Sequence, residues 1–439
     1  MPITYGTFQN PYSANSIWNL PIGSGAIYGD TSFQIGVNSA ILFEYTGIHL
    51  INPSDPTRNV FAKVDVAGGP SAEVYCQATN VSGGIHFTVK IPDSLVYSVK
   101  RGNGIWCFYD GSAGTVMESY EWQRCTTASQ SADHFSPRGP IALNSDGRNL
   151  PSGGCQFGSR MCASGGVLRQ GELLGPDPIP HALKMLISTQ AGTHYNGKTS
   201  VVIGTDGQNW RVKPGPAWYG MTHVSDSTNQ PITGGNYATY WELGGISGQT
   251  PITWVPNRRF VYKAAGTGNM YIWPAISAQS GNGLNSNVMM GSLFALQPSF
   301  DVTQLLTIPA RKIAQAFKTY GGYAVDTGGT AKPYWGVALE VHGNFGAVGG
   351  SPVQDEVWST YNIDMARSNA NLLWTMSPPT NTTPETVNFK ADMDLIYSNL
   401  AVVVNTDLAD GGTAPKGPGG PPAGDTTPPA KVLNLRKVG

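Results

Sequence analysis

Short runs of alternating hydrophobic and polar residues fill the first quarter of the chain. Turn-forming residues separate SAILFEYTG (residues 39–47), VFAKVDVAG (60–68), AEVYCQA (72–78) and GIHFTVKIP (84–92). Alternation with a period of two is typical of strands that bury one face. We therefore predict consecutive antiparallel strands between residues 33 and 99.

A hairpin is predicted between residues 101 and 124. Its strands, NGIWCFYDG and TVMESYEWQR, are joined by the turn-forming residues DGSAG. Glu118, Tyr120 and Trp122 alternate along the second strand, so one face combines aromatic and acidic groups. Such a face can stack on the apolar side of a sugar ring, and it is also typical of an ordinary half-buried hairpin.

Further strands are predicted in the second half of the chain. The segment PIPHALKMLIST (178–189) is a mainly hydrophobic run, as expected of a buried strand. If it is extended, His181 and Lys184 point to opposite faces. Shorter candidates follow: KTSVVIGTDG (198–207), NWRVKPG (209–215), ATYWELGG (238–245), NRRFVYKAAG (257–266) and MYIWPAIS (270–277).

One helix is predicted, from about Pro309 to Tyr320. Thr307 can cap its N-terminus through the hydroxyl, and Pro309 suits the first turn. Lys312 and Lys318 fall on the side opposite the apolar face. That face consists of residues three or four apart, Ile313, Ala314, Phe317 and Gly321, and the glycine also ends the helix.

The helix is flanked by two predicted strand ends, which carry Asp301 before it and Asp326 after it. A single helix in a β-rich chain usually covers one face of a sheet. The fold class that follows is mainly β. We expect an antiparallel β-sandwich or jelly roll with one well-defined α-helix and long Gly/Pro loops.

Composition supports many short strands joined by loops. The 439 residues include 55 glycines and 32 prolines, well above the roughly 12% of average usage. Residues 1–405 are expected to form one large β-rich domain or two packed β subdomains. Residues 406–439 are rich in proline and glycine, which predicts a linker, and their end resembles the first strand of a fibronectin-III-like module.

Charge and hydropathy narrow the choice of partners. The net charge of −1, without a basic run before the last few residues, argues against nucleic acid as the main partner. No hydrophobic run approaches the roughly 20 residues of a membrane span, and the N-terminus lacks a secretory signal pattern. No metal site or cofactor is predicted, because the chain has no CxxC motif and its seven histidines are scattered.

The five cysteines are an odd number, so at least one thiol is free if disulfides form. Cys155 and Cys162 flank a Gly-rich stretch and can pair. They lie in a long loop predicted over residues 129–166. His134 and Arg138 sit near each other in this loop, where they either line a cleft or anchor the loop.

Several motifs occur in order along the chain: SIWN (16–19), IPHALKM (179–185), YIWPA (271–275), MGSLFALQPSFD (290–301) and AFKTYGGYAVDTG (316–328). In this order they resemble an uncharacterised family of bacterial and phage-associated extracellular proteins. The resemblance implies a β-rich fold located outside the cell, at the cell surface or in a phage virion. Gln297 stands where that family often has a cation.

Polar residues inside apolar segments give the candidate chemistry, because such groups are costly to bury without partners. We predict His181, Asp301, Asp326 and Glu340 as catalytic residues. Carboxyl pairs suit glycoside hydrolysis, and a base with a proton donor suits lyase chemistry. The predicted substrate-binding residues are Tyr271, Trp273, Trp335, Lys184, His134 and Arg138.

The leading hypothesis is an extracellular carbohydrate-active protein that binds and cleaves a bacterial polysaccharide, as a glycoside hydrolase or a polysaccharide lyase. The alternative is a non-catalytic module of a phage tail or surface fibre, or an adhesive structural module. Either can form a homo-oligomer or join a larger surface or phage assembly. Convergence of Asp301, Asp326 and His181 on one cleft is the structural feature that the catalytic hypothesis expects.

Overall fold

The fold is known from a computed structural model. It describes residues 3–23, 26, 28–30, 40–62, 84–97, 104–133, 138–145, 147, 154–156, 158–187, 240–242, 260–263, 270–272, 274–275, 290–327, 334–342, 351–365, 375–376 and 383–403.

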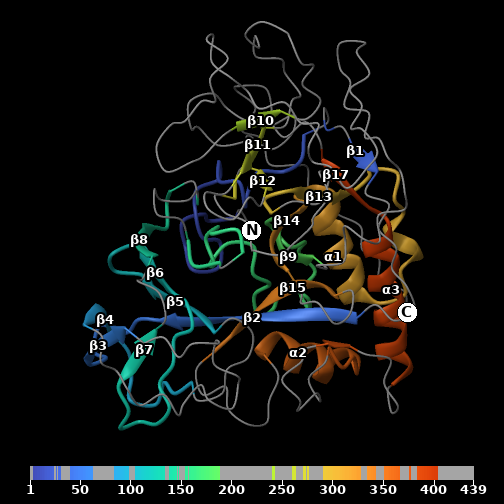
Figure 1. The fold of residues 1–439 in the computed structure, drawn as a ribbon. Coiled ribbons are helices and arrows are strands. Elements are labelled where there is room, and N and C mark those ends of the chain that lie inside the picture. The colour runs from blue at the N-terminus through green and yellow to red at the C-terminus, as the bar shows by residue number, and fades with distance from the viewer. Residues whose placement is uncertain are drawn as a thin grey trace, which may run out of the picture.

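An 11-stranded sheet forms the centre of the described molecule (Figure 1). Its strands, in spatial order, are β1 (Tyr28–Asp30), β17 (Leu400–Val403), β13 (Leu293–Leu296), β14 (Gly322–Thr327), β9 (Leu183–Ile187), β15 (Tyr334–Val341), β2 (Ala40–Leu50), β5 (Ile105–Asp110), β6 (Thr115–Ser119) and β8 (Arg138–Ala142), with β16 (Thr375–Met376) paired to β2. The prediction of a mainly β fold is therefore confirmed.

The sheet is mixed rather than antiparallel. Strands β15, β2 and β5 run parallel to one another, and so do β9 and β14, whereas the other pairs are antiparallel. The C-terminal ends of these three parallel strands consequently point in the same direction. The sheet thus differs from the expected antiparallel sandwich or jelly roll, because parallel pairing joins strands far apart in sequence.

The central strands are buried on both faces, which explains their hydrophobic sequences. All residues of β9 are buried, as are the first five of β5. Strand β14 carries a bulge between Ala324 and Asp326. The predicted hairpin is confirmed, since β5 and β6 pair antiparallel across a short turn.

Two three-stranded sheets complete the strands of the described residues. One contains β4 (Ile85–Lys90), β3 (Thr57–Ala62) and β7 (Ser131–Asp133), and the other contains β10 (Tyr240–Glu242), β11 (Phe260–Lys263) and β12 (Met270–Ile272). Strands β7 and β8 lie in the stretch predicted as one long loop, so that prediction was wrong in part.

Helix α1 (Ile308–Thr319) confirms the predicted helix, and Gly321 follows it with φ of +76°. Two details of the prediction were wrong. The Thr307 hydroxyl does not cap the helix but donates to Asp392 of α3 (Pro384–Ser398) at 2.7 Å. Lys312 is buried, because its ammonium group donates to the Gly175 and Asp177 carbonyls.

The described residues hold three α-helices, not one. Besides α1 and α3 there is α2 (Pro352–Tyr361), which begins with a capping box formed by Ser351 and Gln354. Helix α2 packs on one face of the sheet, where Tyr45 of β2 donates to Gln354 at 2.9 Å (Figure 1). A short 3₁₀ helix, η2 (Val302–Gln304), precedes α1.

Cys155 and Cys162, which were able to pair by their sequence positions, are buried and not in a disulfide, and neither is Cys107. Cys125 is in a disulfide. The predicted linker at 406–439 and the strands at 72–78, 198–207 and 209–215 lie outside the described residues. Among the helices that the structure describes, none has the length and hydrophobicity to cross a membrane.

Candidate functional site

The face of the main sheet opposite α2 carries buried polar residues, which we call the polar face. The pairing of residues between adjacent strands places their side chains on the same face of the sheet, because side chains alternate between the two faces along a strand. They are Glu44 and Thr46 of β2, Glu118 of β6, Lys184 of β9, Asp326 of β14 and Glu340 of β15. Buried charged groups require hydrogen-bond or ion-pair partners.

A covering segment, residues 154–156 and 158–169, supplies most of these partners. It is rich in small residues, which lets its backbone approach the sheet closely. Gly165 and Gly166 lie against the ring of Trp18, where an added Cβ would come within 2.5 Å of the indole. The Leu168 amide donates to the Ala338 carbonyl of β15 at 2.9 Å.

Glu118 anchors the centre of the covering segment. Its carboxylate accepts from the Cys155 amide at 3.0 Å, the Ser164 amide at 2.9 Å and the Ser164 hydroxyl at 2.7 Å. The Tyr12 hydroxyl makes a further short hydrogen bond with the Ser164 hydroxyl. Burial raises the pKa of Tyr12 well above its ordinary value, so this phenol stays neutral.

Lys184 is held beside the same segment. Its ammonium group donates to the Ala163 carbonyl and to the Thr46 hydroxyl. Burial lowers the pKa of Lys184, and the nearby carboxylates of Glu44 and Glu118 act in the opposite direction. Lys184 is thus fully buried in the sheet, with its ammonium group bonded to protein acceptors.

Gln156 connects two carboxylates at one end of the polar face. Its Nε2 donates to Glu44 Oε2 at 3.2 Å and to Asp326 Oδ2 at 3.1 Å. Asp326 therefore has Glu44 as its neighbour, not His181 or Asp301. Both carboxylates are buried.

Arg169 lies at the other end of the polar face. Its Nη2 donates to the Tyr109 hydroxyl at 2.9 Å and to the Ser164 carbonyl at 3.0 Å, and its Nη1 lies 3.6 Å from Glu340 Oε2. Its guanidinium carbon also lies 5.1 Å from the centre of the Phe8 ring. Burial opposes its charge, but Tyr109 and Glu340 outweigh that effect and raise the pKa of Arg169.

Two histidine–carboxylate pairs flank Arg169. His181 Nε2 lies 3.1 Å from Glu172 Oε1, and the Glu172 carboxylate accepts from the Arg169 amide at 2.7 Å. His342 Nε2 lies 2.9 Å from Glu340 Oε1. We call these five residues the Arg169 site. Its sequence-predicted members are His181 and Glu340, which the structure brings to the same arginine.

The position of the Arg169 site follows from the sheet. Glu340 and His342 come at the end of β15, and Tyr109 lies near the end of β5, which runs parallel to β15 through β2. The carboxyl ends of parallel strands are where α/β sheets commonly bind ligands. His342 is 49% exposed, so the site reaches solvent there.

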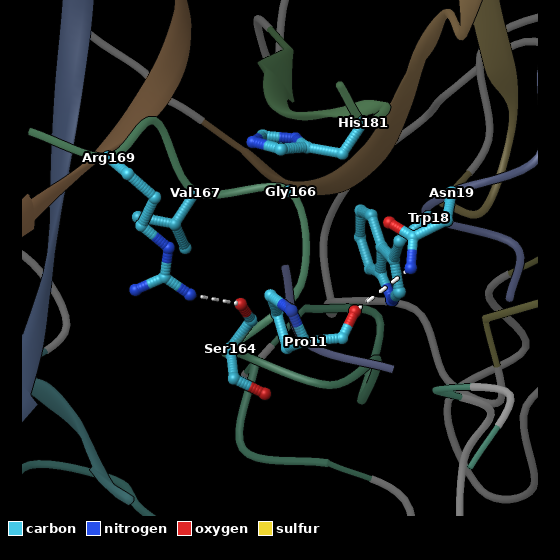
Figure 2. Close-up of a pocket in the computed structure, with 8 residues that line it drawn as sticks. All are labelled: Pro11, Trp18, Asn19, Ser164, Gly166, Val167, Arg169 and His181. Carbon is cyan, nitrogen blue, oxygen red and sulfur yellow. Dashed lines mark hydrogen bonds between the residues drawn. The ribbon is translucent and has the colours of Figure 1, made fainter. Parts of the chain in front are cut away.

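A small pocket adjoins the site, with room for about one water molecule (Figure 2). Figure 2 shows the His181 ring above it, Arg169 on one side and Trp18 on the other. Its lining comprises Pro11, Trp18, Asn19, Ser164, Gly166, Val167, Arg169 and His181.

Glu340 and His181 have different surroundings within the site. Burial alone would raise the pKa of Glu340, but the His342 hydrogen bond and the charge of Arg169 hold it below its ordinary value. His181 Nδ1 faces the Ala182 carbonyl at 2.8 Å, which can only accept, so Nδ1 carries hydrogen. Its Nε2 faces the Glu172 carboxylate at 3.1 Å.

The remaining predicted residues lie apart from the site. Asp301 is exposed, and its carboxylate caps η2 by accepting from the Thr303 amide and hydroxyl. The expected convergence of Asp301, Asp326 and His181 on one cleft is therefore absent. Trp335 is buried beside Tyr397, so it offers no ring face to a sugar.

The other predicted binding residues are only partly described. Tyr271 lies in β12 and Arg138 lies in β8. Only the backbone of these two residues is described. Trp273 and His134 lie outside the described residues. In the described part of the chain, no group of three or more His, Cys, Asp or Glu side chains is arranged to hold a metal ion.

Sequence reasoning missed Arg169, Glu172, Glu44 and Gln156. The pattern of Arg169 and Glu172, two charges three residues apart in the otherwise uncharged stretch CASGGVLRQGELLG, was an available indication. No protein-family model, curated protein or solved structure matches this chain. Functional argument therefore starts from the geometry of the site.

Proposed function

We propose that the chain is an extracellular carbohydrate-active protein that binds and cleaves a bacterial polysaccharide by general acid–base chemistry at the Arg169 site. The observation that carries the proposal is that two histidine–carboxylate pairs flank one buried arginine beside a pocket. The resemblance of several motifs to bacterial and phage-associated extracellular proteins supports the polysaccharide as substrate.

The His181–Glu172 pair is the proton donor in this proposal. Breaking a glycosidic bond requires a proton on the leaving oxygen, whether the reaction is hydrolysis or elimination. His181 lines the pocket, and both of its ring nitrogens face oxygen acceptors. In this proposal the hydrogen shared between Nε2 and Glu172 passes to the leaving oxygen.

Glu340 is the base. Its lowered pKa keeps it ionised at neutral pH, and His342 on its other side is open to solvent and can carry the proton away. Arg169 fixes the base and the donor relative to each other, since it contacts Glu340 through its side chain and Glu172 through its backbone. A fixed geometry of this kind is what acid–base catalysis requires.

The test is an assay on a panel of bacterial exopolysaccharides. Cleavage is followed by new reducing ends and by the absorbance of unsaturated uronates, which separates a hydrolase from a lyase. Glu340→Gln and His181→Gln should each lower kcat by about 100-fold or more, since general acid or base catalysis contributes about 10²–10⁴-fold. Asp301→Asn, a change at an exposed helix cap, is the matched control and should retain activity.

A non-catalytic module of a phage tail or surface fibre is the second candidate. The observation in its favour is that Arg169, Glu340 and His181 are all buried, as they would be in a purely structural brace. A trimer or filament that binds glycans, with no turnover of any polymer in the panel, would establish this candidate and exclude the catalytic one.

A further inference from the structure

We propose that the pocket between Arg169 and Trp18 seats a carboxylate oxygen of the substrate, which makes the substrate an acidic polysaccharide containing uronic acids or similarly carboxylated sugars. This inference rests on the proposed function, because it names the class of polysaccharide that the Arg169 site takes. It concerns recognition of the sugar and is independent of which bond is broken.

The first support is a pair of buried donors without acceptors. Trp18 lines the pocket and is 1% exposed, and its indole Nε1 has no hydrogen-bond partner within the described residues. Arg169 Nη1 likewise lacks a hydrogen bond there, since Glu340 lies 3.6 Å away. Leaving a buried N–H unpaired is costly, so a ligand that supplies acceptors is favoured.

The second support is that three acceptor oxygens of the pocket lining already receive hydrogen bonds. The Ser164 carbonyl accepts from Arg169, and the Pro11 carbonyl accepts from the side-chain Nδ2 of Asn19 at 3.0 Å (Figure 2). The Ser164 hydroxyl donates to Glu118, so it is the acceptor in its short hydrogen bond with the Tyr12 hydroxyl. The buried side-chain groups of the lining that lack a hydrogen bond within the described residues are therefore N–H groups of Trp18 and Arg169, which select an acceptor rather than a donor.

The third support is charge. A guanidinium with a single, non-bidentate carboxylate contact retains capacity for a second anionic group, because its planar fork suits two parallel bonds. A neutral hydroxyl would leave this capacity unused. The pocket's volume, about that of one water molecule, fits one carboxylate oxygen while the sugar ring stays outside.

The probe is the indole N–H resonance of Trp18 in the ¹⁵N-labelled full chain, followed during titration with polygalacturonate and, as a neutral control, with dextran. Trp18→Phe removes the N–H together with part of the ring, and the loss of its signal assigns the resonance. If that variant does not fold, the through-space contact from the indole N–H to the α protons of Gly165 assigns it, because the backbone of Gly165 lies against Nε1.

Polygalacturonate should shift the Trp18 resonance in a saturable manner, and dextran should not. Arg169→Lys, which keeps the charge but loses the planar fork, should weaken polygalacturonate binding at least 10-fold. An unshifted Trp18 resonance, or an equal shift with dextran, overturns the inference. Cleavage of a neutral polymer in the panel would then leave the proposed function standing, whereas the absence of both binding and cleavage would remove both.

Discussion

At the scale of single residues, the polar face shows how a sheet can hold many buried charges. Glu118 is the clearest case, since one carboxylate satisfies two backbone amides and a hydroxyl of the covering segment. Three hydrogen-bond donors thus converge on one buried carboxylate. Its removal leaves three buried donors with no acceptor.

Glu118→Ala should therefore lower the free energy of unfolding by about 3 kcal/mol or more, because unsatisfied buried donors cost about 1–3 kcal/mol each. Glu118→Gln retains one acceptor oxygen and should cost clearly less. Urea unfolding monitored by tryptophan fluorescence measures both. Equal losses for the two variants would show that packing volume, not hydrogen bonding, is the function of this side chain.

Glu340 predicts a pH dependence whose sign follows from its environment. Its folded-state pKa lies below the reference value of 4.5, so its ionised form stabilises the fold above that pH. This contribution is lost as pH falls through the folded-state pKa. The difference in unfolding free energy between wild type and Glu340→Gln should thus have its largest value near pH 7 and decrease below pH 4.5.

His342→Gln provides the comparison for that experiment. The His342 hydrogen bond is a main cause of the lowered pKa of Glu340, so its loss should move the acid transition to higher pH. Thermal unfolding measured at a series of pH values reports both effects. If the difference in unfolding free energy between wild type and Glu340→Gln grows on acidification, Glu340 is not ionised in the way assigned here.

At the scale of elements, the sequence predicted what local pattern determines. Helix α1 has a continuous apolar face, a proline in its first turn and a terminal glycine, and all three are visible in the chain. Helix α2 buries only Val353, Gln354 and Val357, too few to establish a period. Its capping box, Ser351 with Gln354, was the better indication.

Strand direction could not be predicted, because it depends on partners far apart in the chain. Strand β2 pairs in parallel with β15, almost 300 residues later, and each strand alone looks like half of a hairpin. The site has the same origin. His181 and Glu340 were visible as polar groups in apolar runs, whereas Arg169 sits in a Gly-rich segment whose fold only tertiary contacts define.

Contact between β2 and β5 gives a test at this scale. Gly47 of β2 faces the Trp106 ring of β5, and an added Cβ would lie 2.3 Å from that ring. Gly47→Ala should cost about 1–3 kcal/mol in unfolding free energy through overpacking. Gly111→Ala is the matched control, because nothing lies within 4 Å of a Cβ there. A Gly47→Ala variant as stable as this control would mean that the two strands separate easily.

At the scale of the whole molecule, the covering segment and the sheet form one hydrogen-bonded unit. The Leu168 amide donates to Ala338, and the Glu340 amide donates back to the Leu168 carbonyl at 3.0 Å. The Lys184 amide also donates to the Gly166 carbonyl. Leu168 is thus bonded into the sheet directly before Arg169, so the guanidinium is positioned by the sheet rather than by a free loop.

Hydrogen exchange can decide whether the Arg169 site is rigid in this way. The amides of Leu168 and Glu340 should exchange only through global unfolding. The free energy of opening measured at these amides should then decrease with denaturant as steeply as the free energy of global unfolding. The Ser112 amide, bonded only to the Asp110 side chain in an exposed turn, is the fast-exchanging control. If Leu168 instead exchanges through a smaller opening, the covering segment is a lid over the polar face. Arg169 would then move with it, and His181 and Glu340 would be held together only in the closed form.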